Sequence, residues 1–150
     1  MIRNKWAKAF AAKLGLVQRE PADVLLITDL LQMMAEQRAD FTNTFRGLLT
    51  GTARDQFADP SQFDAWTERW QQRQRGAPGA EELMAQSNPA FIPRNHQIEA
   101  MITSAVAGDF DPFTRLQTVL QRPFENQHDT SDLMKPPAPN EVVNATFCGT

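Results

Sequence analysis

The stretch PADVLLITDLLQMMAEQR, residues 21–38, decides the fold class of this chain. Its apolar residues recur every three or four positions, which is the spacing of one face of an α-helix. Pro21 is tolerated in the first helical turn, and the carboxylate of Asp23 favours the same end. An apolar face this wide predicts a central, largely buried helix. The residues of the face are Val24, Ile27, Leu31 and Met34, widened by Leu26, Leu30 and Met33.

Acidic residues mark the starts of two further helices. Asp40 is expected to cap a helix over residues 41–49, because its carboxylate can accept a backbone N–H there. Asp59 and Pro60 form the next start, an acidic cap followed by a first-turn proline. Aromatic side chains at helical spacing either stack on bases or pack a core, and the absence of a basic groove favours the core. The expected buried faces are Phe41, Phe45 and Leu48 or Leu49, and then Phe63, Trp66 and Trp70.

The second half of the chain repeats this pattern after a break at residues 76–79, Gly-Ala-Pro-Gly. We expect a short helix over residues 80–86. A second one runs from Pro93 to about Ala107, and a third begins at Asp111 and ends before Pro123. The expected buried faces of the last two helices are Ile98, Met101, Ile102 and Ala105, and then Phe113, Leu116, Val119 and Leu120.

Helical periodicity stops at Glu125. Residues 125–141 contain Pro136, Pro137 and Pro139 among polar residues, which is typical of an extended arm. We therefore predict an all-α protein, an irregular bundle of about six helices with an extended C-terminal arm. Its expected domains are a helical domain over residues 1–124 and a proline-rich tail over residues 125–150.

Composition limits the classes of function. The 150 residues carry a net charge of −3, which argues against a general nucleic-acid binder. Residues 1–19 hold five basic side chains and no acidic one, with Trp6, Phe10 and Leu14 four positions apart. This pattern fits a mitochondrial presequence or a helix on a membrane surface, but a basic-faced helix ending near Gly15 is favoured, and no membrane partner is expected. A single cysteine suits a reducing compartment, so we expect the cytoplasm, or the mitochondrion for a eukaryotic source.

The residues alone indicate no active site. The chain has no nucleotide-binding glycine loop and no zinc-protease motif, and His96 and His128 are too isolated for a structural zinc site. Asp109 and Asp111 fit helix caps better than a cation site. Four arginines on the helices could bind phosphate but are expected to be solvated or paired with carboxylates; they are Arg46, Arg94, Arg115 and Arg122.

Several fragments, in order, resemble the C-terminal part of the selenoprotein O family. The clearest are NPAFIPRN at residues 88–95, GDF at 108–110 and LQRPF at 120–124. Earlier matches are KLGL at 13–16, DLL at 29–31 and DFTNTFR at 40–46. The resemblance runs from about Trp6 to Thr150. One departure is Pro93, where many members have leucine, and a proline there suits a helix start.

The resemblance implies a part of a kinase-like protein adenylyltransferase. Members of this family bind ATP in a flipped orientation and transfer AMP, with Mg²⁺, to hydroxyl side chains of proteins. The third residue from their C-terminus is selenocysteine or cysteine, which matches Cys148, and it is associated with redox control through a bond to a cysteine of the core. The ATP and metal ligands of the family have no counterpart here. The resemblance therefore assigns no catalytic, cofactor-binding or metal-binding residue, and it assigns only Cys148 as a redox position.

The leading hypothesis is a C-terminal region of such an enzyme, present as a truncated or separate chain and inactive alone. It predicts an exposed apolar face that binds the missing kinase-like core or a second copy. Protein substrates are expected for the full-length members of the family. An alternative is a complete helical interaction module, and a third is a membrane-surface protein that uses the basic first helix.

Overall fold

The computed structural model describes residues 2–144, and the side chains of residues 5–144. In this part of the chain there are seven α-helices, three short 3-10 turns and no strand, so the all-α prediction is confirmed. The chain divides into two compact units, Met1–Pro89 and Ala90–Thr150. We call them the N-terminal unit and the C-terminal unit and describe each by itself.

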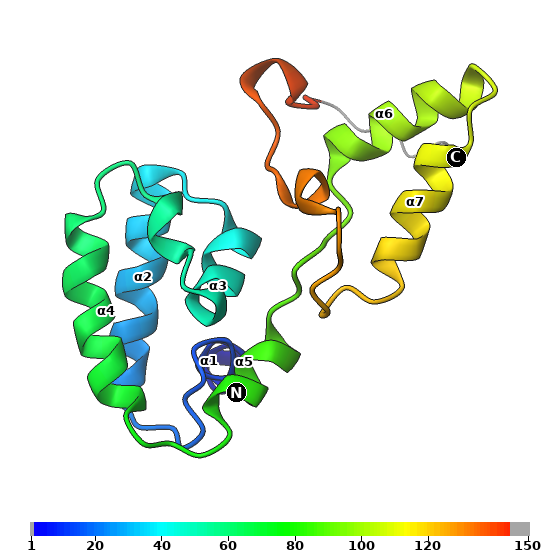
Figure 1. The fold of residues 1–150 in the computed structure, drawn as a ribbon. Coiled ribbons are helices and arrows are strands. Elements are labelled where there is room, and N and C mark those ends of the chain that lie inside the picture. The colour runs from blue at the N-terminus through cyan, green and yellow to red at the C-terminus, as the bar shows by residue number, and fades with distance from the viewer. Residues whose placement is uncertain (1, 145–150) are drawn as a thin grey trace. The chain divides into compact units, whose positions relative to one another are not determined.

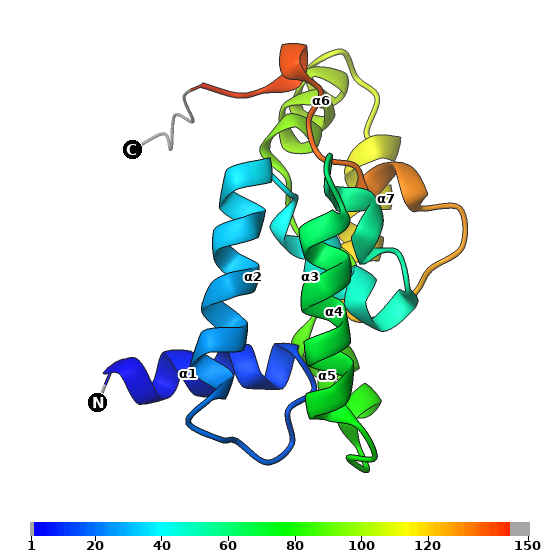
Figure 2. The ribbon, with the colours of Figure 1, turned by 90° about the vertical axis from the view of Figure 1, so that its left-hand side faces the viewer.

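The N-terminal unit contains five α-helices and one 3-10 turn. Helices α2 and α4 lie side by side, and α1 crosses the N-terminal end of α2 (Figures 1 and 2). Helix α5 contacts α1 and α3. The bounds are α1 Ile2–Lys13, α2 Asp23–Gln37, α3 Phe41–Thr50, η1 Ala53–Gln56, α4 Ser61–Gln74 and α5 Ala80–Ser87.

Helix α2 is the centre of this core, as its sequence predicts. Five of the seven residues predicted for its apolar face are buried, and Leu31 is half-buried. Val24, in the first turn of α2, is the exception and is 44% exposed. The prediction that Val24 belongs to the buried face is therefore wrong. The buried residues are Leu26, Ile27, Leu30, Met33 and Met34.

The two tryptophans of α4 form hydrogen bonds to the backbone of other segments of the unit. Trp66 donates from Nε1 to the backbone oxygen of Leu26 at 2.8 Å, and Trp70 donates to that of Leu14 at 2.8 Å. The rings of Phe63, Trp66 and Trp70 are stacked one on the next and are buried. Because a buried indole needs a partner for its N–H, these bonds let large rings fill the core. The prediction that this aromatic face packs in the core is confirmed.

One predicted acidic cap is confirmed, whereas the capping positions of α4 and α7 are Pro60 and Phe110 instead of the predicted Asp59 and Asp111. The carboxylate of Asp40 accepts the Asn43 N–H at 2.9 Å, as expected for the start of α3. Gly51 closes α3 with φ +81°, a conformation that glycine adopts readily. Pro21 and Pro60 were predicted to lie in the first turn of their helices. Instead, α2 begins two residues after Pro21 and α4 begins one residue after Pro60. Phe41, predicted to be buried at the start of α3, is 46% exposed, although its ring contacts those of Phe10 and Phe45.

The two units meet at Pro89 and Ala90, not at the glycine-rich break of residues 76–79. That break is a tight connection between α4 and α5. Helix α5 belongs to the N-terminal unit because Asn88, at its C-terminal end, is buried and donates to the backbone oxygen of Lys13 at 2.8 Å. Bonds so distant in sequence are not visible in a pattern of prolines and glycines.

The C-terminal unit is a helical hairpin with a long segment after it. Helices α6, Asn95–Val106, and α7, Asp111–Leu120, contact each other and are joined by residues 107–110 (Figure 1). The backbone of Ala90 and Phe91 bonds to the oxygen of Pro123, at 2.8 and 3.2 Å. Next to this pairing lies a small core of Ala90, Phe91 and Val119. The partly buried side chains packed on it are Leu120, Leu133 and Met134.

Helix α6 departs from the prediction in two ways. It begins at Asn95, two residues after Pro93, and none of its residues is buried. Ile102, predicted on its buried face, is 46% exposed. Phe113 of α7 was also predicted to be buried and is 44% exposed, whereas Leu116 and Val119 are buried. The apolar stripes are present, but among the elements of residues 2–144 α6 packs extensively only on α7, and Ile102 and Phe113 remain exposed.

Residues 121–144 contain no α-helix, in line with the predicted loss of periodicity, but they are not uniformly extended. They form two 3-10 turns, η2 at Ser131–Met134 and η3 at Pro139–Glu141. The proposed domain boundary between residues 124 and 125 stays a prediction. Of the helices within residues 2–144, none combines the length and apolar character that a membrane span requires.

Candidate functional site

The one site residue predicted from the sequence, Cys148, lies outside the residues that the structure describes. The described part of the chain offers four features that a function could use. They are a buried polar cluster, an arginine clamp, a hollow beside the α4–α5 connection, and an apolar groove on the C-terminal hairpin.

The buried polar cluster, which we call the Asn88 cluster, joins three helices of the N-terminal unit. Lys13 donates from Nζ to the oxygen of Ser87 at 2.9 Å and to Oδ1 of Asn88 at 3.5 Å. Arg46 donates from Nη1 to the Asn88 oxygen at 3.0 Å. Burial lowers the pKa of Lys13 and that of Arg46, because a cation loses hydration there.

Aromatic rings complete the surroundings of Lys13. Its ammonium lies 5.6 Å from the ring centres of both Phe41 and Phe45, within the range of cation–π attraction. The cluster therefore ties α1, α3 and α5 together through contacts within the unit. The sequence does not predict this cluster. Asn88 is the first residue of the NPAFIPRN stretch, but no neighbouring residue indicates that the Asn88 side chain reaches Lys13.

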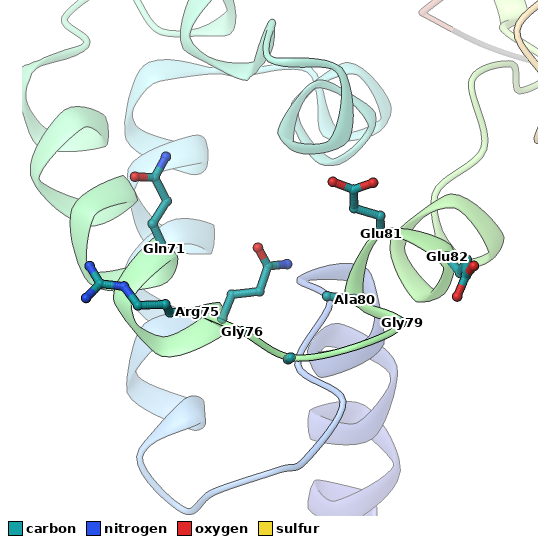
Figure 3. Close-up of a pocket in the computed structure, with 9 residues that line it drawn as sticks. Gln71, Arg75, Gly76, Gly79, Ala80, Glu81 and Glu82 are labelled. Carbon is teal, nitrogen blue, oxygen red and sulfur yellow. The ribbon is translucent and has the colours of Figure 1, made fainter.

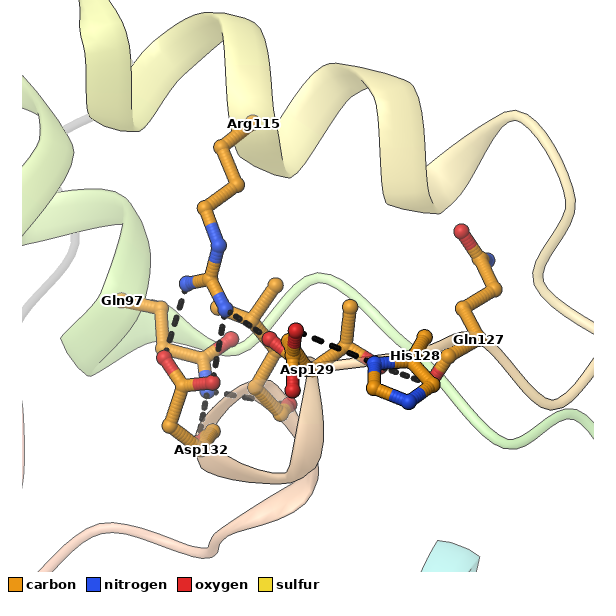
Figure 4. Close-up of polar contacts among 8 residues, drawn as sticks. Gln97, Arg115, Gln127, His128, Asp129 and Asp132 are labelled. Atoms are coloured by element: carbon orange, nitrogen blue, oxygen red, sulfur yellow. Dashed lines mark hydrogen bonds and ion pairs between the residues drawn. The ribbon is translucent and has the colours of Figure 1, made fainter.

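The arginine clamp holds the segment after α7 onto that helix (Figure 4). Arg115 makes two parallel bonds to the Asp132 carboxylate, at 2.8 and 2.7 Å, and also donates to the backbone oxygen of Asp129 at 2.8 Å. Gln97 of α6 donates to the oxygen of Leu133 at 3.0 Å. Hydrogen bonds from Arg115 lower the pKa of Asp132, and the same contact raises the pKa of Arg115.

The four arginines considered as phosphate ligands have other surroundings. Arg115 bonds Asp132, and Arg122 pairs with Glu125 at 3.1 Å. These two confirm the expected pairing with carboxylates. Arg46 bonds a backbone oxygen in the Asn88 cluster, and Arg94 is buried. Asp109 accepts the Asp111 N–H at 3.0 Å in a turn just before α7, whose capping position is Phe110 and carries no side-chain cap bond.

The hollow beside the α4–α5 connection has a volume of about 450 Å³. Gln71 and Arg75 reach it from the end of α4, and Glu81 and Glu82 from the first turn of α5 (Figure 3). In that view the Arg75 guanidinium and the Glu82 carboxylate point away from each other. The lining therefore lacks a convergent set of charged groups.

The acidic and histidine side chains of the described residues are dispersed. Within residues 2–144 no group of three or more His, Cys, Asp or Glu side chains lies close enough to hold a metal ion. His128 contacts Asp129 at 3.0 Å, and His96 borders a different hollow of the C-terminal unit.

The apolar groove, which we call the α6–α7 groove, has a volume of about 460 Å³. Ile98 and Met101 line it from α6, and Phe113, Leu116 and Leu120 line it from α7. The remaining lining residues are Pro93, Gln117 and Gln121, so no side chain of the lining carries a charge. An uncharged apolar groove is the kind of surface that binds an apolar partner.

Comparison with known proteins identifies the relatives of this chain. Residues 1–121 match the family described as protein adenylyltransferase SelO. A protein nucleotidyltransferase YdiU of Ruegeria sp. (strain TM1040) is 53% identical over 150 residues, which is 100% of this chain and 32% of that protein. The protein of the same name from Ruegeria pomeroyi is 50% identical over the same coverage. That from Roseobacter denitrificans is 44% identical over 99% of this chain and 31% of the relative.

These relatives are much longer than this chain. The chain spans about a third of the length of the curated relatives that it matches. The resemblance noted in the sequence is therefore confirmed at the level of the family, and most of each relative has no counterpart in this chain.

Proposed function

Because the chain belongs to the SelO family of protein adenylyltransferases, we propose that it acts as the C-terminal part of such an enzyme. The whole-length enzyme transfers AMP from ATP to serine, threonine or tyrosine hydroxyls of other proteins. Its ATP and Mg²⁺ ligands belong to the part without a counterpart here. This chain contributes a helical support and the tail that carries Cys148.

The observation that carries the proposal is the match of the whole chain to one third of each relative, at 53% identity for the first Ruegeria protein. The helices of the N-terminal unit support a structural role, since their polar side chains bond to side-chain and backbone atoms of neighbouring helices. Lys13, Arg46 and Asn88 are engaged in this way within the unit. An uncovered apolar groove supports a role that involves a partner.

The test uses three proteins: this chain, the Ruegeria sp. relative without its matching third, and a chimera in which this chain replaces that third. Each is incubated with labelled ATP, Mg²⁺ and a mixture of proteins. We expect AMP transfer by the chimera and none by this chain alone. Transfer by the isolated chain would sink the proposal, and so would a folded chimera that transfers no AMP.

Cys148 is proposed as a redox position whose partner cysteine lies in the rest of the whole-length enzyme. In the isolated chain the proposal predicts one free thiol that reacts with a thiol reagent without denaturant. The Cys148→Ser variant is the blank for this titration. A thiol that reacts only after unfolding would mean that the tail is packed away.

We also propose that the protein acts in the cytoplasm. The support is indirect, namely the single cysteine and the bacterial origin of the relatives named above. Fractionation of cells that make the chimera tests this, and recovery with the membrane pellet would count against it.

A further inference from the structure

We propose that the α6–α7 groove binds an apolar helix from the part of the whole-length adenylyltransferase that has no counterpart in this chain. The inference rests on the proposed function and deepens it, because it names the contact surface and the chemistry of the partner. The groove residues used in the argument are Ile98, Met101, Phe113, Leu116 and Leu120.

The first observation is the exposure of apolar side chains along one side of the hairpin. Ile102 follows Ile98 by one helical turn and Val106 follows Ile102, so the three lie on one face of α6. Phe113, which lines the groove from α7, is 44% exposed, and Ile102, which follows the lining residues Ile98 and Met101 in α6, is 46% exposed. A contiguous exposed apolar surface of this kind marks an interaction site.

The second observation is that the chain's own C-terminal segment is committed elsewhere. Arg115 and Gln97 hold residues 129–133 on the hairpin, and Leu133 and Met134 pack on Val119 in the small core. Six residues of 132–141 line a neighbouring hollow that shares Met101 and Leu116 with the groove, and none of them lines the groove itself. This part of the segment is therefore not the occupant of the groove.

The lining defines the chemistry of the occupant. No lining side chain is charged, and burying an unpaired charge against such a surface costs several kcal/mol. A third helix laid between two packed helices is the common way to complete a helical layer. The relatives are long enough to supply it, because about two thirds of each has no counterpart in this chain. An amphipathic helix that presents its apolar face therefore fits best.

Hydrogen exchange tests the proposal on the isolated chain and on the chimera with the Ruegeria sp. relative. We expect amides of α6 and α7 to exchange at least tenfold more slowly in the chimera, with α2 amides as the internal reference. Equal rates would overturn the proposal. Slow exchange already present in the isolated chain would also overturn it, and would assign the occupant to the N-terminal unit, or to a second copy if the rates depend on concentration.

Variants locate the contact within the hairpin. In the chimera, Phe113→Asp is expected to restore fast exchange in α6, and the milder Ile102→Gln is expected to act in the same direction. The matched control is Leu25→Asp, which changes a side chain that is 64% exposed in the N-terminal unit. Circular dichroism of each isolated variant verifies its fold. If Leu25→Asp and Phe113→Asp have the same effect, the groove is not the contact.

The readouts separate this inference from the proposed function. A chimera that transfers AMP while its groove exchanges as fast as in the isolated chain keeps the function and loses the groove contact. A chimera with a protected groove and no AMP transfer keeps the contact and loses the function.

Discussion

The ion pair between Asp23 and Arg73 offers the sharpest test of what holds the N-terminal unit together. Asp23 is 4% exposed, and its carboxylate accepts from Arg73 Nε at 2.7 Å and Nη2 at 3.1 Å. It also accepts the N–H of Glu20 at 2.7 Å. One buried side chain thus joins the start of α2, the loop before it and the last turn of α4. We expect Asp23→Ala to destabilise the unit more than any surface change.

The loss in free energy of unfolding depends on the Arg73 guanidinium, which Asp23→Ala leaves without its carboxylate partner. Removing one partner of a buried pair costs about 3–5 kcal/mol, because the other charge stays buried without its counter-ion. Arg73 keeps two contacts, with the Gln18 oxygen and with the Glu20 carboxylate at 3.6 Å, and its side chain is 22% exposed. These contacts offset part of the loss, so we expect about 2–3 kcal/mol for Asp23→Ala.

Urea unfolding followed by tryptophan fluorescence measures this loss, since Trp66 and Trp70 are buried on the helix that bears Arg73. The matched control is Asp29→Ala, which breaks the pair with Arg69 between the same two helices. That pair is exposed on both sides, so we expect less than about 1 kcal/mol. Equal losses for the two variants, or a loss below about 0.5 kcal/mol for Asp23→Ala, would refute the reasoning from burial.

Three further changes test other contacts. A Cβ on Gly47 would lie 2.5 Å from the backbone nitrogen of Ala53, so Gly47→Ala should cost about 1–3 kcal/mol in urea unfolding. Trp66→Phe removes a buried N–H bond and ring volume, and should cost about 2 kcal/mol in the same assay. Arg115 lowers the pKa of Asp132, so the clamp is intact above the ordinary aspartate pKa and opens as pH falls through the lowered value. NMR shifts of η2 amides should follow that acidic titration, and Asp132→Asn should abolish it.

Sequence periodicity predicted which faces are apolar better than it predicted which faces are covered. The stripes of α2 and α6 look alike in the sequence, yet Leu30 of α2 is fully buried and Ile102 of α6 is 46% exposed. The difference lies in the neighbours: among the elements of the described residues, α2 packs on both α1 and α4, whereas α6 packs extensively on α7 alone. Periodicity carries information about one helix and none about the number of its neighbours.

Local caps were readable from the sequence and long-range polar contacts were not. Asp40 accepts the backbone N–H expected of a capping residue, and Asp109 accepts one in the turn before α7, because their partners lie two or three residues away. Asp23 was expected only to favour a helix start, and its partner Arg73 lies 50 residues further along. Asn88 likewise bonds Lys13 across 75 residues. A single sequence offers no signal for pairs this far apart.

The uneven covering of the two units predicts the order in which the isolated chain unfolds. The core of the C-terminal unit consists of three buried apolar residues and a few partly buried ones, whereas that of the N-terminal unit is several times larger. Covering Phe113 and Ile102 would remove roughly 170 Å² of apolar surface from water, which corresponds to about 4 kcal/mol.

The C-terminal unit therefore lacks a stabilising contribution of the size that decides whether a small unit stays folded. On heating the isolated chain, we expect helix content to fall in a first step that leaves tryptophan fluorescence unchanged, because all three tryptophans lie within residues 1–89. In the chimera the first step should move toward the second, since a partner that binds only the folded unit stabilises it. Coincident transitions in the isolated chain would show that the C-terminal unit needs no outside cover.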